Sequence, residues 1–114
     1  MNRTSSVVRE TSFRYPDTWL VRPRIRLYGD RLELTGWRFT GRHRRVIELS
    51  EIASIKWWSG VNHAANLDLH LDDGEQLSLW VKGPGLWRFK ITEHAPDIEE
   101  QNPSLKQNVA APTA

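Results

Sequence analysis

The sequence contains no cysteine and a single methionine in 114 residues. Without thiols, disulfide scaffolds, zinc sites built on thiolates and cysteine nucleophiles are all excluded. Long apolar runs are missing as well, because no stretch approaches the roughly 20 residues that a membrane-spanning helix needs. Residues 1–14 are polar and rich in arginine, unlike the apolar centre of a secretion signal. We therefore expect a soluble, cytoplasmic protein.

Charge is unevenly spread along the chain, although the net charge is only +2. Residues 1–45 contain eleven arginines and four acidic residues, which gives +7, whereas the remainder has five basic and ten acidic residues, which gives −5. This asymmetry predicts either an acidic partner or a fold in which basic strands lie beside acidic ones, and we favour the second. The length fits one domain with a modest core.

The most regular pattern lies in Asn66–Trp80, where apolar residues alternate with polar ones on both sides of a turn. Such alternation indicates a half-buried β-hairpin. A three-residue loop over 72–74, with Gly74 in the left-handed conformation, pairs Leu69 with Leu77. A two-residue loop would place apolar residues opposite polar ones, so the register follows from the sequence.

Two further hairpins are predicted between residues 24 and 49. In the first, Gly29–Asp30 forms a two-residue type II′ turn, because glycine occupies the first turn position, and Leu27 pairs with Leu32. In the second, the two-residue loop is Thr40–Gly41. That loop gives three characteristic pairs: Leu34 with Ile47, Trp37 with Arg44, and Glu33 with Glu48.

The rest of the chain is divided by breaks in the pattern. Residues 52–58 form a fourth strand, and the hairpin described above supplies the next two. Residues 86–94 fit a strand or a short helix, and we favour the helix because Pro84 suits a first turn. Three regions result: a flexible N-terminal arm or edge strand (1–12), a β domain (13–96) and a disordered tail that adds nothing to the core (97–114).

These elements resemble the pleckstrin-homology (PH)-like superfold, nearest its bacterial PH and GRAM-like members. The features that carry the likeness are the meandering strands, the phrase VIELSEIASIKWW, the glycine-turn hairpin and the closing segment led by Trp87. The resemblance covers Trp19 to His94. It implies a mainly β fold, a small antiparallel barrel of six to seven strands with a short C-terminal helix, and a non-catalytic binding or scaffold domain. The seventh strand would come from residues 7–13 or 19–21.

One ligand known for this superfold is not expected here. PH domains that bind phosphoinositides place basic residues around an extended first hairpin loop, whereas this chain has only Gly29–Asp30 there. Catalysis is not expected either. Asp68, His70 and Asp72 share a strand face, but alternation by itself places polar residues on a solvated face. We therefore predict no enzyme activity, no metal and no cofactor.

The predicted outer face of the first three strands combines arginines with aromatic rings, and two tryptophans of later strands also point away from the inner leucines. The ten candidate partner-binding residues are Arg24, Arg26, Arg31, Trp37, Phe39, Arg42, Arg44, Arg45, Trp58 and Trp80. We predict that they mediate protein–protein interaction or self-association. An alternative is nucleic acid or anionic lipid, since bases stack on rings beside basic side chains. In a third interpretation, the rings pack beneath the N-terminal aromatic segment and the arginines solvate the rim.

Overall fold

A computed structural model describes residues 6–58 and 65–101, and within them the chain is mainly β. Its one α-helix is α1 (Pro84–His94), and a single 3₁₀ turn, η1 (Leu49–Glu51), precedes the sixth strand. The strands are β1 (Arg9–Thr11), β2 (Phe13–Arg14), β3 (Val21–Leu27), β4 (Arg31–Arg38), β5 (Gly41–Glu48), β6 (Ile52–Trp57), β7 (Leu67–Leu71), β8 (Gln76–Val81) and β9 (Glu99–Gln101).

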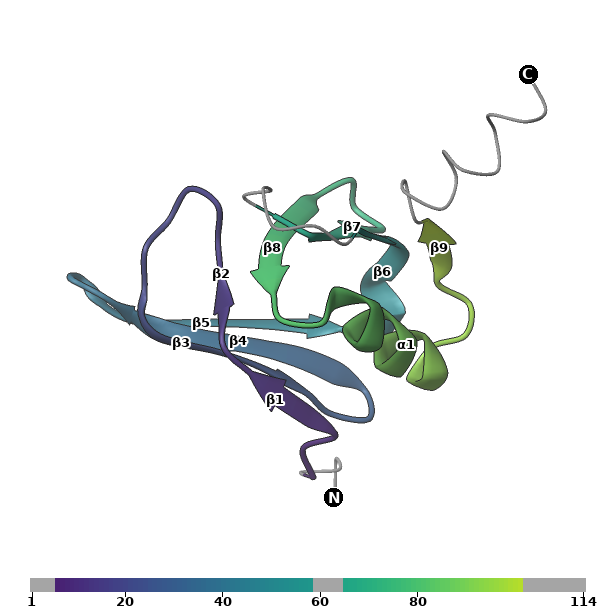
Figure 1. The fold of residues 1–114 in the computed structure, drawn as a ribbon, viewed down its shortest axis with the longest axis horizontal. Helices are drawn as coiled ribbons and strands as arrows, with labels where there is room; N and C mark the ends of the chain where they lie inside the picture. Colours follow the sequence, from purple (N-terminus) through teal and green to yellow (C-terminus); the bar gives the residue numbers. More distant parts are fainter. Residues whose placement is uncertain (1–5, 59–64, 102–114) are drawn as a thin grey trace.

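The strands form two sheets that face each other (Figure 1). The first sheet has the order β1-β3-β4-β5 and the second the order β2-β8-β7-β6-β9. All pairings are antiparallel except that of β9, which runs parallel to β6. The chain passes to the second sheet at Ser12, between β1 and β2, returns to the first sheet through residues 15–20, and passes to the second sheet again through η1. No described helix combines the length and the apolar character needed to cross a bilayer.

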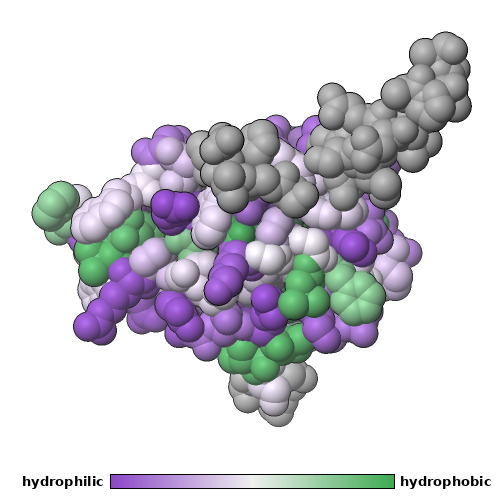
Figure 2. All heavy atoms as spheres, viewed as in Figure 1, coloured by the Kyte–Doolittle hydropathy of each residue, from purple (hydrophilic) through white to green (hydrophobic). Residues whose placement is uncertain are grey.

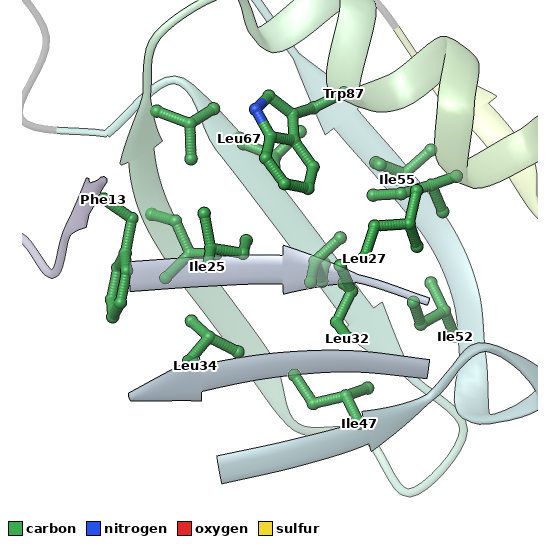
Figure 3. Packing of buried hydrophobic residues seen from close by; sticks show 14 of the residues in the cluster. Phe13, Ile25, Leu27, Leu32, Leu34, Ile47, Ile52, Ile55, Leu67 and Trp87 are labelled. Atoms are coloured by element: carbon green, nitrogen blue, oxygen red, sulfur yellow. The ribbon is translucent and has the colours of Figure 1, made fainter. Parts of the chain in front are cut away.

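The core lies between the two sheets and is closed on one side by α1 (Figures 1 and 3). Alternating apolar residues of each sheet point into it, because successive side chains of a strand face opposite sides. Each fully buried leucine, isoleucine or phenylalanine contributes roughly 1.5–3 kcal/mol through removal from water. The largest fully buried side chains are Phe13, Ile25, Leu27, Leu32, Leu34, Ile47, Ile55, Leu67, Leu69, Leu79, Trp87 and Ile91.

The β7–β8 hairpin has the predicted register. Leu69 pairs with Leu77, and the backbone N–H of Leu71 donates to the carbonyl of Glu75 at 2.8 Å across a three-residue loop. Gly74 has a φ of +92°, a region that glycine enters without a Cβ clash. Both the apolar pairing and the turn residue therefore predicted this element correctly.

The β3–β4 hairpin also has its predicted register, with Leu27 opposite Leu32. The expected type II′ turn at Gly29–Asp30 is wrong, however, because that turn requires a positive φ at its first position and the φ of Gly29 is not positive. The length of the loop therefore predicted the strand pairing correctly, whereas the position of the glycine predicted the wrong turn type.

The predicted register of β4 and β5 is wrong by two residues. The loop is Phe39–Thr40, and β5 begins at Gly41, whose φ is +135°. The observed register avoids the like-charge pair of Glu33 with Glu48, because Glu33 lies opposite the uncharged Val46. In place of the predicted pairs, Ile47 lies opposite Leu32, Trp37 opposite Arg42, and Glu48 opposite Arg31.

Both ends of the domain contribute strands. Residues 84–94 form the favoured helix, and the edge-strand alternative for the N-terminal stretch is correct at β1, with β2 following it. The predicted disorder of the tail is wrong for residues 98–101. Ile98 is buried, and β9 pairs with Ser54–Lys56 of β6. The remainder of the predicted tail, residues 102–114, lies outside the described residues.

Candidate interaction surface

The ten candidate residues do not form one surface. Arg45 lies opposite Leu34 and therefore on the inner side of the first sheet, and Trp58 and Trp80 belong to the β6 and β8 segments of the second sheet. The other seven candidates lie on the outer face of the first sheet or at its β4–β5 turn, and these are Arg24, Arg26, Arg31, Trp37, Phe39, Arg42 and Arg44.

Most arginines of this outer face already bind carboxylates. Glu10 of β1 lies 3.2 Å from Arg24 and 3.0 Å from Arg26. Glu33 of β4 lies 3.5 Å from Arg31 and 3.1 Å from Arg44. Because each carboxylate lies between two guanidinium groups, much of the positive charge is balanced locally. A phosphate group would have to compete with these ion pairs.

Arg45 has a structural contact instead. Its guanidinium donates to both carboxylate oxygens of Glu75, at 2.7 and 2.6 Å, and so joins β5 to the β7–β8 turn of the other sheet. The hydrogen bond with Glu75 raises the pKa of Arg45, and the same bond lowers the pKa of the Glu75 carboxyl below its usual value. This bidentate pair connects the two sheets at their edge.

Trp58 and Trp80 are both half-buried. The guanidinium of Arg14 lies 4.6 Å from the centre of the Trp80 ring, a cation–π contact between β2 and β8. Neither tryptophan lies with the seven residues of the first sheet.

Four exposed apolar residues gather where the first sheet extends beyond the second (Figure 1), and we call this group the aromatic end. The exposed fractions are 75% for Trp19, 44% for Val21, 51% for Trp37 and 104% for Phe39. Together with Arg38 and Thr40 they line a groove of about 460 Å³. Figure 2 shows apolar side chains gathered at this end of the molecule. A contiguous apolar patch of this kind is typical of an interaction site.

Gly36 explains how the loop before β3 reaches the aromatic end. Gly36 is buried in β4, and a Cβ there would lie 3.0 Å from Leu20 Cδ1 and 3.3 Å from the carbonyl oxygen of Val21. The absent side chain lets Leu20 pack onto the strand, while its neighbour Trp19 stays exposed. A glycine inside a regular strand often marks such a close approach. Trp19 and Val21 were not among the candidate residues predicted from the sequence. A glycine within the strand pattern, Gly36, was the one signal that another segment lies close to this strand.

The aromatic end carries its own positive charge. Arg22, Arg38 and Arg42 are exposed, and none of them forms an ion pair with a carboxylate among the described residues. Arg22 also has a φ of +52°, at the irregularity where the pairing of β3 shifts between Val21 and Arg24. The surface therefore combines exposed rings with guanidinium groups that have no described counter-ion.

A hydrogen bond between Tyr15 and His43 supports the loop that leads to the aromatic end. The Tyr15 hydroxyl lies 2.9 Å from His43 Nε2, and the two rings meet edge to face. Burial lowers the pKa of His43, and the nearby charges of Arg38 and Arg45 lower it further. Burial also raises the pKa of Tyr15. A neutral imidazole beside a protonated phenol is therefore the favoured state.

The three polar residues of β7 and its turn are not equivalent. Asp68 is buried, which contradicts the expected solvated face, whereas His70 is half-buried and Asp72 is exposed. One oxygen of Asp68 accepts a hydrogen bond from Gln76 at 3.2 Å. Over residues 6–58 and 65–101, no group of three His, Cys, Asp or Glu side chains is placed to hold a metal ion.

No protein-family model matches the sequence, and a search of curated proteins found no match. Function is therefore inferred from the exposed surface of the molecule. The feature that stands out on that surface is the aromatic end, with its groove and the exposed Arg22, Arg38 and Arg42 of β3, β4 and β5.

Proposed function

We propose that this chain is a non-catalytic, PH-like interaction domain that docks onto a protein partner or a second copy through the aromatic end. The observation that carries the proposal is the exposure of Trp19, Trp37 and Phe39 around one groove. Aromatic residues and arginine dominate the binding energy of protein interfaces. Each buried aromatic side chain removes roughly 150–250 Å² from water.

The arrangement of the elements supports the PH-like interpretation. Two facing sheets share one core, an N-terminal stretch contributes a strand to each sheet, and a single helix follows the last antiparallel strand. This agrees with the strand meander and closing helix that the resemblance implies. Such a scaffold holds its loops rigidly, and loops on a rigid scaffold commonly carry binding sites.

A photoreactive residue at position 39 tests the proposal. p-Benzoylphenylalanine in place of Phe39 leaves the packing intact, because the phenyl ring is fully exposed. After irradiation in the natural host, we expect a defined adduct at this position that is lost when Trp37→Ser is added. The control places the same residue at Asp73, an exposed position in the β7–β8 turn. Equal labelling at positions 39 and 73 would contradict the proposal.

A second candidate is binding of nucleic acid or anionic lipid by the same end, and the exposed arginines Arg22, Arg38 and Arg42 favour it. Affinity for vesicles rich in phosphatidylserine, or for single-stranded DNA, should then fall steeply with salt. Arg42→Ala should reduce the slope of log affinity against log salt by about 1. Arg44→Ala is the matched control on the same strand, and we expect a smaller change because Arg44 already binds Glu33.

A further inference from the structure

We infer that the aromatic end is a self-complementary interface, at which two copies of this chain pair about a twofold axis and each Phe39 enters the groove of the other copy. The inference rests on the proposed function and names the partner as a second copy. It depends on the shape, the area and the charge of the aromatic end.

The shape of the aromatic end suits a symmetric pair. Phe39 occupies the β4–β5 turn and is 104% exposed, so its ring projects from the molecule with little contact to its own chain. The base of the same side chain forms one side of the groove of about 460 Å³, whose other sides include Trp19, Val21 and Trp37, and this volume is large enough to hold a second phenyl ring. In a symmetric pair, the Phe39 ring of each copy can enter the groove of the other, because a twofold axis makes the two contacts identical.

The area matches a weak, specific dimer. With 150–250 Å² for each ring when fully covered, the three exposed rings offer on the order of 400 Å² of apolar surface per copy. With Val21, Arg38 and Thr40 at the edges, the pair would bury about 1,000 Å² in total, where specific interfaces begin. An interface of this size belongs to the weak, transient class, well short of an obligate dimer.

The dependence on salt should distinguish pairing of two copies from binding of an anionic ligand. Arg22, Arg38 and Arg42 of both copies would lie near one another, and like charges weaken association most at low salt. The carboxylate nearest to Trp19 along the chain is that of Asp17, two residues before it. Added salt should therefore strengthen the dimer, whereas it weakens binding to phosphate groups.

Sedimentation equilibrium of the full chain tests the inference. Over a roughly hundredfold range of protein concentration, we expect a monomer–dimer equilibrium that shifts toward dimer as salt increases. Phe39→Ser should raise the dissociation constant at least tenfold. Phe89→Ser, an exposed phenylalanine of α1 with 48% exposure, is the matched control and should leave it unchanged. Circular dichroism should be the same for all three proteins.

A single engineered cysteine gives a second, independent measurement, because the chain contains none of its own. Thr40→Cys places a thiol beside Phe39, and we expect faster disulfide-linked dimer formation than with Asp73→Cys in the β7–β8 turn. A monomer at every concentration, or a dimer that Phe39→Ser does not weaken, would overturn the inference. If the chain stays monomeric but position 39 cross-links to another protein, the proposed function stands. If it stays monomeric and no adduct forms, both fail.

Discussion

At the scale of single residues, Gly36 has the clearest structural role at the candidate surface. Gly36→Ala would place a Cβ 3.0 Å from Leu20 and 3.3 Å from the backbone of Val21. We expect a loss of about 1–3 kcal/mol in unfolding free energy, as for other overpacked sites. Gly29→Ala is the matched control, because nothing lies within 4 Å of its Cβ position and its φ is not positive. Urea unfolding measures both; equal losses would contradict this account.

His43 predicts a dependence of stability on pH. Its pKa in the folded protein is lowered from 6.5, mainly by burial and also by Arg38 and Arg45. The unfolded chain therefore binds the proton first, and folding stability is lost as the pH falls below 6.5 toward the lowered pKa. His43→Gln removes this proton uptake. Between pH 7.5 and 5, about the range in which histidine titrates, the wild type should lose more stability than His43→Gln. Parallel pH curves would show that His43 makes no contribution.

Residue-level prediction from sequence succeeded for the buried leucines and failed for the arginines. Alternation places Leu27, Leu32 and Leu69 inside without knowledge of the partner strand. Pairing of the arginines with Glu10 and Glu33 depends on which strands are neighbours, and β1 was expected only as an arm or edge strand. Alternation predicts that a charged side chain faces solvent, but it does not predict which carboxylate that side chain will bind.

At the scale of elements, the β4–β5 error has a simple cause. A register slip of one residue moves every side chain to the other face, so the hydrophobic pattern detects it. A slip of two residues leaves each side chain on its own face, and both registers keep Leu32, Leu34 and Ile47 inside. Only the pairs across the strands differ. The register of the β7–β8 hairpin was not ambiguous in this way, because Gly74 must occupy the left-handed position of its turn.

Strand β9 was missed because it has no apolar residue of its own, and the single buried apolar residue beside it, Ile98, cannot show a period. Ile98 is buried against the core, and Glu100 lies 3.1 Å from Arg88 of α1. Ile98→Ala should lower the unfolding free energy by roughly 2 kcal/mol, since it removes a packed side chain. Glu99→Ala, at the exposed first position of β9, is the control and should cost less than about 0.5 kcal/mol. Chemical unfolding followed by circular dichroism measures both, and equal effects would mean that β9 does not contribute to the core.

At the scale of the whole molecule, the candidate surface was predicted in part. Trp37, Phe39 and Arg42, which were predicted for the outer arginine and aromatic face, lie at the aromatic end. The other two apolar residues of that end were not predicted: Trp19 lies in the loop before β3, and Val21 is the first residue of β3. Arg45, Trp58 and Trp80 lie elsewhere because they belong to the inner side or to the second sheet. A surface assembled from several segments needs the positions of the strands, which the sequence alone does not provide.

The shared core makes one further prediction for the whole molecule. Because both sheets and α1 contribute to a single cluster of buried residues, neither sheet has an independent core. Unfolding should therefore be a single cooperative transition, with coincident curves from far-ultraviolet circular dichroism and tryptophan fluorescence. Leu27→Ala in the first sheet and Leu67→Ala in the second should each shift both curves together, by about 2–5 kcal/mol. Phe39→Ser is the control and should shift neither in dilute solution. Separate transitions for the two probes would mean that the aromatic end belongs to a sheet that can open on its own, and the rigid platform that the docking proposal needs would be absent.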